Sequence, residues 1–294
     1  MDKSNEAVFL QPVFDGQVHR ITLADGRVVQ LEPKSVFVGV VFRNCDLSGL
    51  SLTSCIFADC EFIDCIVRFT EFSRSDFTNV VIRDSDFSGS ALLWNKLKKV
   101  SISGTNLEKV RFNFSNLLEV SFVRCKLAQS EFNRVKVDRS ELSDCDMSEC
   151  RMLGTQISET NLTRLTSSQN WVLATVGLDR CNVLLCAPVH VKASFVEFTD
   201  THFDRSNFWK SEFRRTIFIR TKIAHTGFNQ SKLISCTFIE SNISASRFRL
   251  AHLVETFFEN SSLTYSSLEE AKLETAVFLD SVVENNYTNP HRED

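Results

Sequence analysis

Residues 37–77 read FVGVVFRNCDLSGLSLTSCIFADCEFIDCIVRFTEFSRSDF, and a bulky apolar residue stands at every fifth position from Phe37 to Phe77. The same spacing continues to Leu162, and every position on it is Phe, Leu, Ile, Val or Met. A second run with this spacing extends from Leu173 to Val283. An α-helix needs apolar spacings of three and four, and a half-buried strand needs a spacing of two. The period of five therefore predicts a repeat architecture that is neither of these.

A small residue precedes most of the bulky ones by two positions. Examples are Ser75, Thr105, Ser115 and Ser241, which stand before Phe77, Leu107, Leu117 and Ile243. A bulky and a small inward residue once per five residues fit a coil that turns a corner in every repeat. Leu162 and Leu173 are 11 positions apart, so the pattern predicts one extra residue, a defect, within 163–172.

The units Ser75–Asn79, Thr105–Lys109 and Ser206–Lys210 read SDFTN, TNLEK and SNFWK. They resemble the pentapeptide-repeat family, in particular its Phe- and Cys-rich branch. The resemblance covers about residues 35–285. It implies an all-β fold, a right-handed quadrilateral parallel β-helix with four pentapeptides in each coil, and about 12 coils in this chain.

The ends of the repeat region have their own patterns. Ile21–Leu23 and Val28–Leu31 flank the turn-forming residues Ala24–Arg27, which favours a β-hairpin. We expect residues 1–35 to form an N-terminal cap, 36–285 to form the β-helix, and 286–294 to be a flexible tail. Residues 267–283 fit either an amphipathic helix or a last coil, and the persistent period of five favours the coil.

Composition and charge exclude several classes of protein. The 294 residues carry a net charge of −4, which gives no general basic surface for binding nucleic acid. The N-terminus lacks the pattern of a Sec signal, and no apolar run approaches the ~20 residues of a membrane span. The expected location is the bacterial cytoplasm, and secretion into a host by a Sec-independent route remains an alternative.

The residues that could carry catalysis or bind a metal are dispersed. All ten cysteines stand two positions before a bulky residue, where a thiol acts as a small apolar side chain. A cysteine-rich interior suits a reducing compartment. The six histidines show no recurring partner, and nucleotide-binding, zinc-protease and hydrolase motifs are missing. We therefore expect no enzyme activity, no metal and no cofactor.

Outward residues that are 20 positions apart should form columns on neighbouring coils. One column holds Trp94 and Phe114 between Arg74 and Arg134, and Phe69, one coil lower on the neighbouring face, would widen the patch. Large aromatic residues and Arg are enriched at binding hot spots, so these five are the candidate partner-binding residues. A ladder that only stabilises the coils is the alternative interpretation.

Two further surface features concern charge. A second column, Lys99, Glu119, Arg139 and Glu159, alternates in sign and so should neutralise itself. The last coils are acidic through residues that include Glu255, Glu259, Asp280 and Glu284.

The leading functional hypothesis is a rigid, non-catalytic scaffold for protein–protein interaction whose partner and oligomeric state the sequence leaves open. The alternative, implied by the resemblance, is a DNA mimic that protects DNA gyrase or a related type II topoisomerase from quinolones. The alternating column opposes this, because mimicry requires a continuous negative face. A third hypothesis is an effector of a specialised bacterial secretion system.

Overall fold

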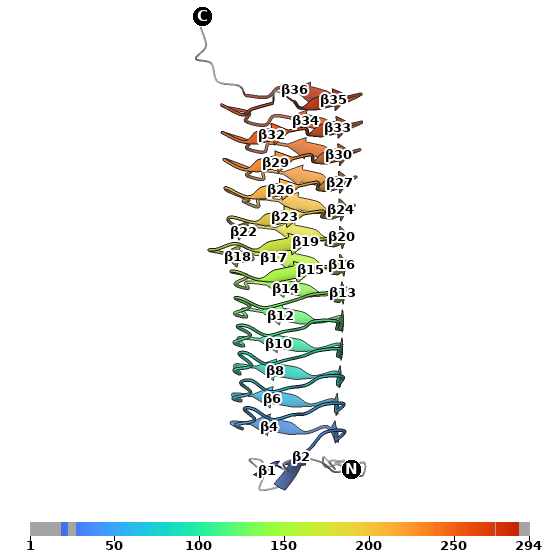
Figure 1. Ribbon diagram of the computed structural model, residues 1–294, viewed down its shortest axis with the longest axis vertical. Helices are drawn as coiled ribbons and strands as arrows, with labels where there is room; N and C mark the ends of the chain where they lie inside the picture. Colours follow the sequence, from blue (N-terminus) through green and yellow to red (C-terminus); the bar gives the residue numbers. More distant parts are fainter. Residues whose placement is uncertain (1–18, 23–27, 274, 288–294) are drawn as a thin grey trace, which may run out of the picture. The chain divides into compact units, whose positions relative to one another are not determined.

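A computed structural model describes residues 19–22, 28–273 and 275–287. The chain divides into two compact units, residues 1–146 and 147–294. Both are parallel β-solenoids, and together they contain about 12 turns (Figure 1). Among the described residues there is no helix, and hence none that could cross a membrane. The predicted all-β solenoid is confirmed.

In unit 1, two parallel sheets form two sides of the turns, and single bridges such as Asp46↔Ile66 and Ser51↔Glu71 form the other two. The strands of the first sheet are β3 (Val36–Val38), β5 (Ile56–Ala58), β7 (Asp76–Thr78), β9 (Lys96–Lys98), β11 (Asn116–Leu118) and β13 (Lys136–Asp138). Those of the second are β4 (Val41–Arg43), β6 (Glu61–Ile63), β8 (Val81–Arg83), β10 (Ser101–Ser103), β12 (Ser121–Val123) and β14 (Glu141–Ser143).

Unit 2 continues the same plan with strands on more of its sides. One sheet contains β16 (Gln156–Ser158), β20 (Gly177–Asp179), β24 (Glu197–Thr199), β27 (Ile217–Ile219), β30 (Thr237–Ile239), β33 (Phe257–Glu259) and β35 (Val277–Leu279). The next contains β17 (Asn161–Thr163), β21 (Asn182–Leu184), β25 (His202–Asp204), β28 (Lys222–Ala224), β31 (Asn242–Ser244), β34 (Ser262–Thr264) and β36 (Val282–Glu284). The remaining strands are β15 (Arg151–Leu153), β19 (Val172–Ala174), β23 (Lys192–Ser194), β26 (Glu212–Arg214), β29 (Lys232–Ile234), β32 (His252–Val254), β18 (Thr166–Ser167) and β22 (Ala187–Pro188).

Equivalent positions on successive turns are 20 residues apart, so each side of a turn stacks on the same side of the next turn. In unit 1, Phe57 pairs with Phe37 and Phe77, and all three rings stack inside the solenoid at centroid distances of 5.0 and 4.9 Å. The bulky positions are almost fully buried in both units, as the sequence predicted, except in the last turn, where Leu273 and Phe278 are half-buried and Val283 is exposed. Stacked aromatic rings fill a narrow core without voids, because flat rings lie parallel at the strand spacing.

The small position connects one turn to the next. The Ser115 hydroxyl donates to the carbonyl of Leu92 at 2.7 Å and accepts the N–H of Asn95 at 2.9 Å. Cysteine keeps half of this arrangement: the Cys236 thiol donates to the carbonyl of Phe213 at 3.4 Å. A hydroxyl in this position satisfies two backbone groups that the turn would leave buried and unpaired.

One turn of unit 2 is a residue longer. Ser167 pairs with Pro188, a separation of 21, whereas Val172 pairs with Lys192, a separation of 20. The extra residue thus lies between Ser167 and Val172. That 36–285 behaves as one domain stays a prediction.

The core compensates for this irregular turn by exchanging large and small residues. Trp171 occupies the small position before Leu173 and is only 7% exposed. Pro188 and Ala193 stand at bulky positions in the following repeats, and Ala193 lies in register between Leu173 and Phe213. The small side chains of Pro188 and Ala193 leave room for the Trp171 indole, so the side-chain volume inside the turn changes little.

The N-terminal hairpin and the last coil agree with the sequence. Strands β1 (His19–Thr22) and β2 (Val28–Leu31) pair antiparallel, although the turn between them lies outside the described residues. β35 and β36 pair in parallel with β33 and β34, so the described part of 267–283 is a coil and the helix alternative is wrong. Most of the cap at 1–35 and of the tail at 286–294 lies outside the described residues, so both remain predictions.

Replacing Phe122 by Asp should destabilise the protein by at least about 4 kcal/mol, because Phe122 is fully buried and a carboxylate there has no cationic partner. The matched control is Asn116→Asp. Asn116 is exposed and lies in register between Lys96 and Lys136, so the new charge should be tolerated. Thermal melts of both variants check the expectation, and equal small shifts would show that the inward assignment is wrong.

Candidate functional site

The candidate site lies on a corner of unit 1 where the backbone is left-handed. The second residue after each bulky one has a positive φ, including Trp94 at 61°, Phe114 at 62° and Arg134 at 55°. A left-handed φ turns the chain toward the next side of the coil and points the side chain outward. Residues 20 apart therefore form a vertical column on the corner, as the sequence predicted.

Trp94 and Phe114 stack directly on neighbouring turns. Their ring centroids are 4.3 Å apart and their planes differ by 4°. Trp94 is 58% exposed and Phe114 is 36% exposed, so the rings present a shared apolar surface to solvent. The Arg134 guanidinium carbon lies 5.5 Å from the centre of the Phe114 ring, which is a cation–π contact.

The other two predicted site residues are less closely joined to this stack. Arg74 has the same left-handed backbone, and the described residues give its side chain no ring contact or ion pair. Phe69 stands five positions before Arg74, on the preceding corner of the coil. Its ring lies over Gly89, where an added Cβ would come within 2.6 Å of it. Phe69 is thus part of a separate apolar spot, held by a glycine that leaves room for the ring.

The backbone beneath the aromatic corner is held rigidly. The Asn113 amide donates to Glu131 Oε2 at 2.9 Å, and its oxygen accepts the N–H of Asn133 at 2.9 Å. Trp94 N–H donates to the carbonyl of Asn113 at 3.0 Å. These contacts fix the turn that carries the stack, so the two rings are presented with little freedom.

A second corner carries paired charges in both units. Arg139 lies 3.7 Å from Glu119 in unit 1, and Arg180 lies 3.1 Å from Glu159 in unit 2. Higher in unit 2 the pattern repeats in a bidentate pair between Arg220 and Asp200, at 2.7 and 2.8 Å. Each exposed pair contributes only about 0.2–1 kcal/mol. The pairing changes the surface charge more than the stability, because the arginines interrupt the continuous negative strip that DNA mimicry would require.

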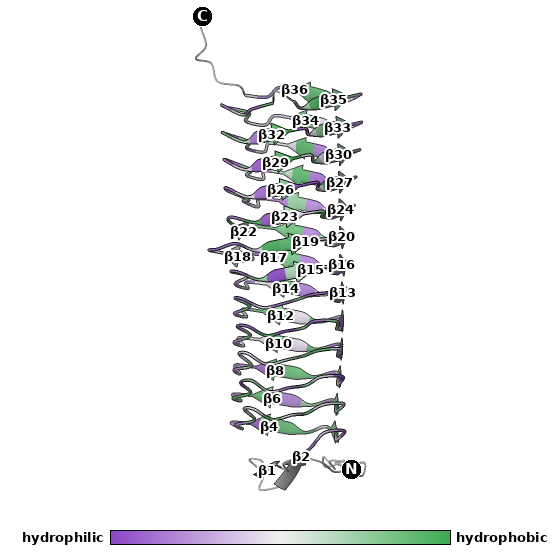
Figure 2. Ribbon diagram, in the orientation of Figure 1, coloured by the Kyte–Doolittle hydropathy of each residue, from purple (hydrophilic) through white to green (hydrophobic). Residues whose placement is uncertain are grey.

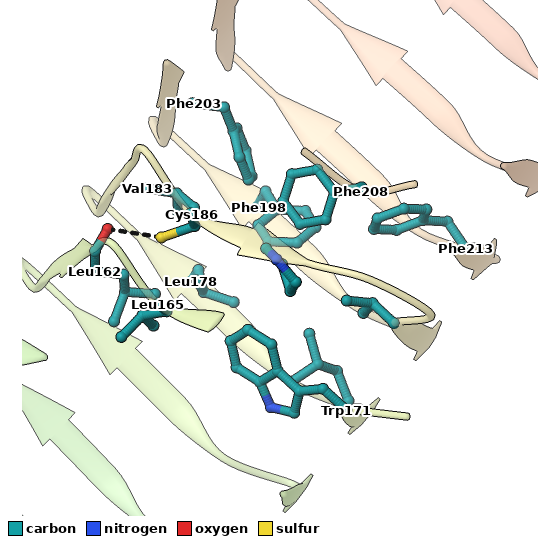
Figure 3. A pocket seen from close by; sticks show the side chains of 13 residues that line it. Leu162, Leu165, Trp171, Leu178, Val183, Cys186, Phe198, Phe203, Phe208 and Phe213 are labelled. Atoms are coloured by element: carbon teal, nitrogen blue, oxygen red, sulfur yellow. Dashed lines mark hydrogen bonds between the residues drawn. The ribbon is translucent and has the colours of Figure 1, made fainter. Parts of the chain in front are cut away.

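The interior of unit 2 contains a small apolar cavity near the longer turn (Figure 3). Its volume is about 30 Å³, and Trp171, Val183 and Phe198 are among the residues that line it. Cys186 borders it and donates its thiol hydrogen to the carbonyl of Leu162 at 3.2 Å. The cavity has about the volume of one water molecule, so it cannot hold a substrate. Among the described residues no three His, Cys, Asp or Glu side chains gather in a way that could bind a metal.

The repeat pattern and the stacked four-sided turns match known protein families. Residues 35–112 and 211–286 match the family described as pentapeptide repeat region, and residues 125–164 match pentapeptide repeats in 8 copies. The chain belongs to the pentapeptide-repeat family. Comparison with curated protein sequences finds no match.

Several solved pentapeptide-repeat and resistance proteins are similar to this chain. Rfr23 from the cyanobacterium Cyanothece is 16% identical with a TM-score of 0.31, and the match covers 37% of this chain and 91% of Rfr23. HetL, from the cyanobacterium Nostoc and involved in heterocyst differentiation regulation, is 14% identical with a TM-score of 0.27, covering 75% and 87%. Full-length QnrB1, a plasmid-mediated fluoroquinolone resistance protein, is 11% identical with a TM-score of 0.37, covering 71% and 94%. Similarity at this level assigns no function to this chain.

Unit 2 of this pentapeptide-repeat chain has two aromatic clusters on its surface, which the sequence reasoning missed. In unit 2, Phe195 is 56% exposed, and Arg215 lies over its ring at 5.3 Å. On another corner, Trp209 contacts Lys210 at 4.2 Å and lies 5.7 Å from the His190 ring. The separation of 20 between Phe195 and Arg215 was visible in the sequence and could have identified the first of these pairs.

The cysteines of the repeats are buried. Burial raises the pKa of the Cys60, Cys181 and Cys236 thiols to about 11. Contact with Cys125 and burial raise the pKa of Cys145 as well. Thiols with a raised pKa remain protonated at neutral pH and are poor nucleophiles. These cysteines therefore serve packing, and the candidate site lies on the surface.

Filling the cavity with Val183→Ile should stabilise unit 2 by roughly 0.7 kcal/mol, the loss expected for an empty volume of about 30 Å³. Val183 lies in register between Leu162 and Phe203, which are both larger. Chemical denaturation measures the gain. Val137→Ile, at a buried bulky position in unit 1, is the control and should bring no comparable increase.

The raised thiol pKa values also predict a pH dependence. Unfolded thiols lose their protons near pH 9, whereas the buried ones hold them to about pH 11, so the unfolded state binds fewer protons in between. The contribution of these thiols to stability should be constant below about pH 8.5 and should be lost as the pH rises through 9 to 11. Cys60→Ser with Cys236→Ser should flatten this fall, since serine occupies the same position elsewhere and does not titrate there. Identical pH profiles of the melting temperature for both proteins would contradict it.

Proposed function

We propose that this pentapeptide-repeat protein is a non-catalytic, rigid scaffold that binds another protein through the aromatic corner formed by Trp94, Phe114 and Arg134. The observation that carries the proposal is the exposed stack of two aromatic rings held at left-handed backbone positions. The proposal extends to a reducing compartment such as the bacterial cytoplasm, supported by the ten cysteines buried inside the turns.

The energetics of the corner favour binding over a purely structural role. A side chain with a Cβ in the left-handed region costs roughly 1–2 kcal/mol, and glycine or asparagine reduces that cost. The stack between Trp94 and Phe114 returns only about 0.5–1.5 kcal/mol. Stability alone therefore gives little reason to place two large aromatic residues at the same corner of adjacent turns. A partner that buries both rings does give a reason.

The chemistry of the corner indicates what a partner must offer. The rings require an apolar groove or pocket, and Arg134, with Arg74 three turns from it in the same column, requires carboxylates at the rim. A rigid solenoid binds without reorganising, so little of the interaction free energy is lost in ordering the surface. The role proposed for these rings and arginine side chains is recognition alone.

Replacing both rings, Trp94→Asn with Phe114→Asn, should leave the melting temperature within a few degrees of the native value. The same change should weaken binding of the partner by more than about 2 kcal/mol, as expected for a hot spot. The measurement is quantitative affinity capture from the source cell, followed by titration of each captured protein against the purified variants.

The matched control for this experiment is Tyr265→Asn. Tyr265 is also aromatic, 60% exposed and left-handed with a φ of 50°, but it belongs to unit 2. It should have no effect on the same partner. Equal binding by the native and doubly substituted proteins would return the rings to a structural role. Protection of DNA gyrase in a supercoiling assay with a fluoroquinolone, unaffected by the double substitution, would favour the topoisomerase alternative.

A further inference from the structure

The outward side of the sheet formed by β27, β30, β33 and β35 in unit 2 is unusually apolar. Ile217, Phe257, Val277 and Leu279 are 37%, 48%, 46% and 55% exposed. Figure 2 shows β35 in the hydrophobic colour. Two more apolar residues, Ile219 and Ile239, are half-buried on this side. We call the surface made by these six residues the apolar face.

The register of the sheet gathers the six apolar residues into two neighbouring rows, each of which also holds one polar residue. Ile217 pairs with Thr237, Thr237 with Phe257, and Phe257 with Val277, so these residues form one row. Ile219, Ile239, Glu259 and Leu279 form the row beside it. Residues in register on adjacent strands lie close enough to share one contact surface.

A solenoid turn does not require this apolar row. In unit 1 the same row begins with the apolar residues Val36 and Ile56 and continues with Asp76, Lys96, Asn116 and Lys136, which are polar. Contiguous exposed apolar surface mainly marks an interaction site. The change from polar to apolar residues within one sheet type therefore identifies a local surface property and not a demand of the fold.

The backbone N–H and C=O groups of this sheet point toward neighbouring strands and not out of its face, and among its described strands near the face only β35, the last of the sheet, has an open edge. β27 pairs with β24 and β30, β30 with β33, and β33 with β35. A partner strand laid on the face would leave its own N–H and C=O groups unpaired, which is costly. A helix satisfies these groups internally. The face therefore suits a helix.

Carboxylates border the part of the apolar face formed by β30, β33 and β35. Glu259 lies within it, and Glu240, Glu255 and Asp280 stand at its corners, all exposed, whereas the corners beside β27 are Arg215 and Arg220. Ser235 donates a hydrogen bond to Glu255 at 2.8 Å. Among the described residues, Glu255, Glu259 and Asp280 form no ion pair with a Lys or Arg. The border thus carries negative charge available to a basic partner.

We propose that the apolar face binds a basic amphipathic helix of a partner protein, with an apolar stripe on Phe257 and Leu279 and with Lys or Arg beside Glu255, Glu259 and Asp280. The rows from Ile217 to Val277 span three strand spacings, about 14 Å. This length matches between two and three helical turns. The surface belongs to unit 2 and involves none of the residues of the aromatic corner, so the inference goes beyond the scaffold role proposed for that corner.

The test uses the full chain and a synthetic helical peptide of about 14 residues, with Leu along one face and Lys on both flanks. The peptide should bind, with an affinity that falls as salt is raised. A second peptide with Glu in place of Lys should bind at least tenfold more weakly. Fluorescence anisotropy of the labelled peptides measures both.

Two variants locate the binding. Phe257→Ser with Leu279→Ser should raise the Kd of the Lys peptide at least tenfold, and Tyr265→Ser, an equally exposed aromatic outside the face, should leave it unchanged. Glu259→Lys should weaken the Lys peptide and strengthen the Glu peptide, while a circular dichroism melt verifies folding.

Three outcomes would overturn the proposal. Binding of the Lys peptide that is insensitive to both variants would place it elsewhere on the surface. Equal affinity for the two peptides would remove the role of the carboxylates. A native dimer in sedimentation that Phe257→Ser dissociates would show that the occupant is a second copy of the chain.

Discussion

The structure depends on the in-register stacking of identical turns, and the small inward position is what makes that stacking complete. A turn that changes direction every five residues would leave backbone N–H and C=O groups pointing into a dry core. The hydroxyl of Ser115 satisfies one of each, from Asn95 and from Leu92 of the preceding turn. Cysteine at this position keeps the bond to the carbonyl and packs as an apolar side chain. Without these contacts the stacked phenyl rings would lie beside unpaired backbone groups, at a cost of about 1–3 kcal/mol each.

Stacking at a fixed separation also organises the surface. Any outward residue is repeated above itself, so a single choice in sequence becomes a column in space. On one corner the columns carry opposite charges that pair, as in Arg220 and Asp200. On another corner the same geometry stacks Trp94 on Phe114. The fold thus supplies a rigid grid, and recognition is determined by which side chains occupy neighbouring points on it.

The two units use the grid differently. Unit 1 stacks two exposed aromatic rings on a corner, where the left-handed backbone projects large side chains into solvent. Unit 2 places apolar residues on the outward side of a sheet with carboxylates at part of its border, where the side chains project from the strands. Unit 2 also accommodates a longer turn. Trp171 stands there where a small residue is usual, and Pro188 and Ala193 stand where bulky residues are usual. A solenoid tolerates such a local change because each turn contacts only its neighbours.

The sequence alone determined the all-β solenoid, the inward residues, the structural place of the cysteines and the column that contains Trp94 and Phe114. It could do so because one period sets both the core and the vertical alignment, so separation along the chain translates directly into position. Tertiary structure alone decided that Arg134 but not Arg74 contacts the rings, and that Phe69 lies apart over Gly89. It also decided that Phe257, Val277 and Leu279 form one exposed face. The physical reason is that ring orientation, side-chain reach and exposed area depend on rotamers and on neighbours across several turns, which a repeat period does not specify.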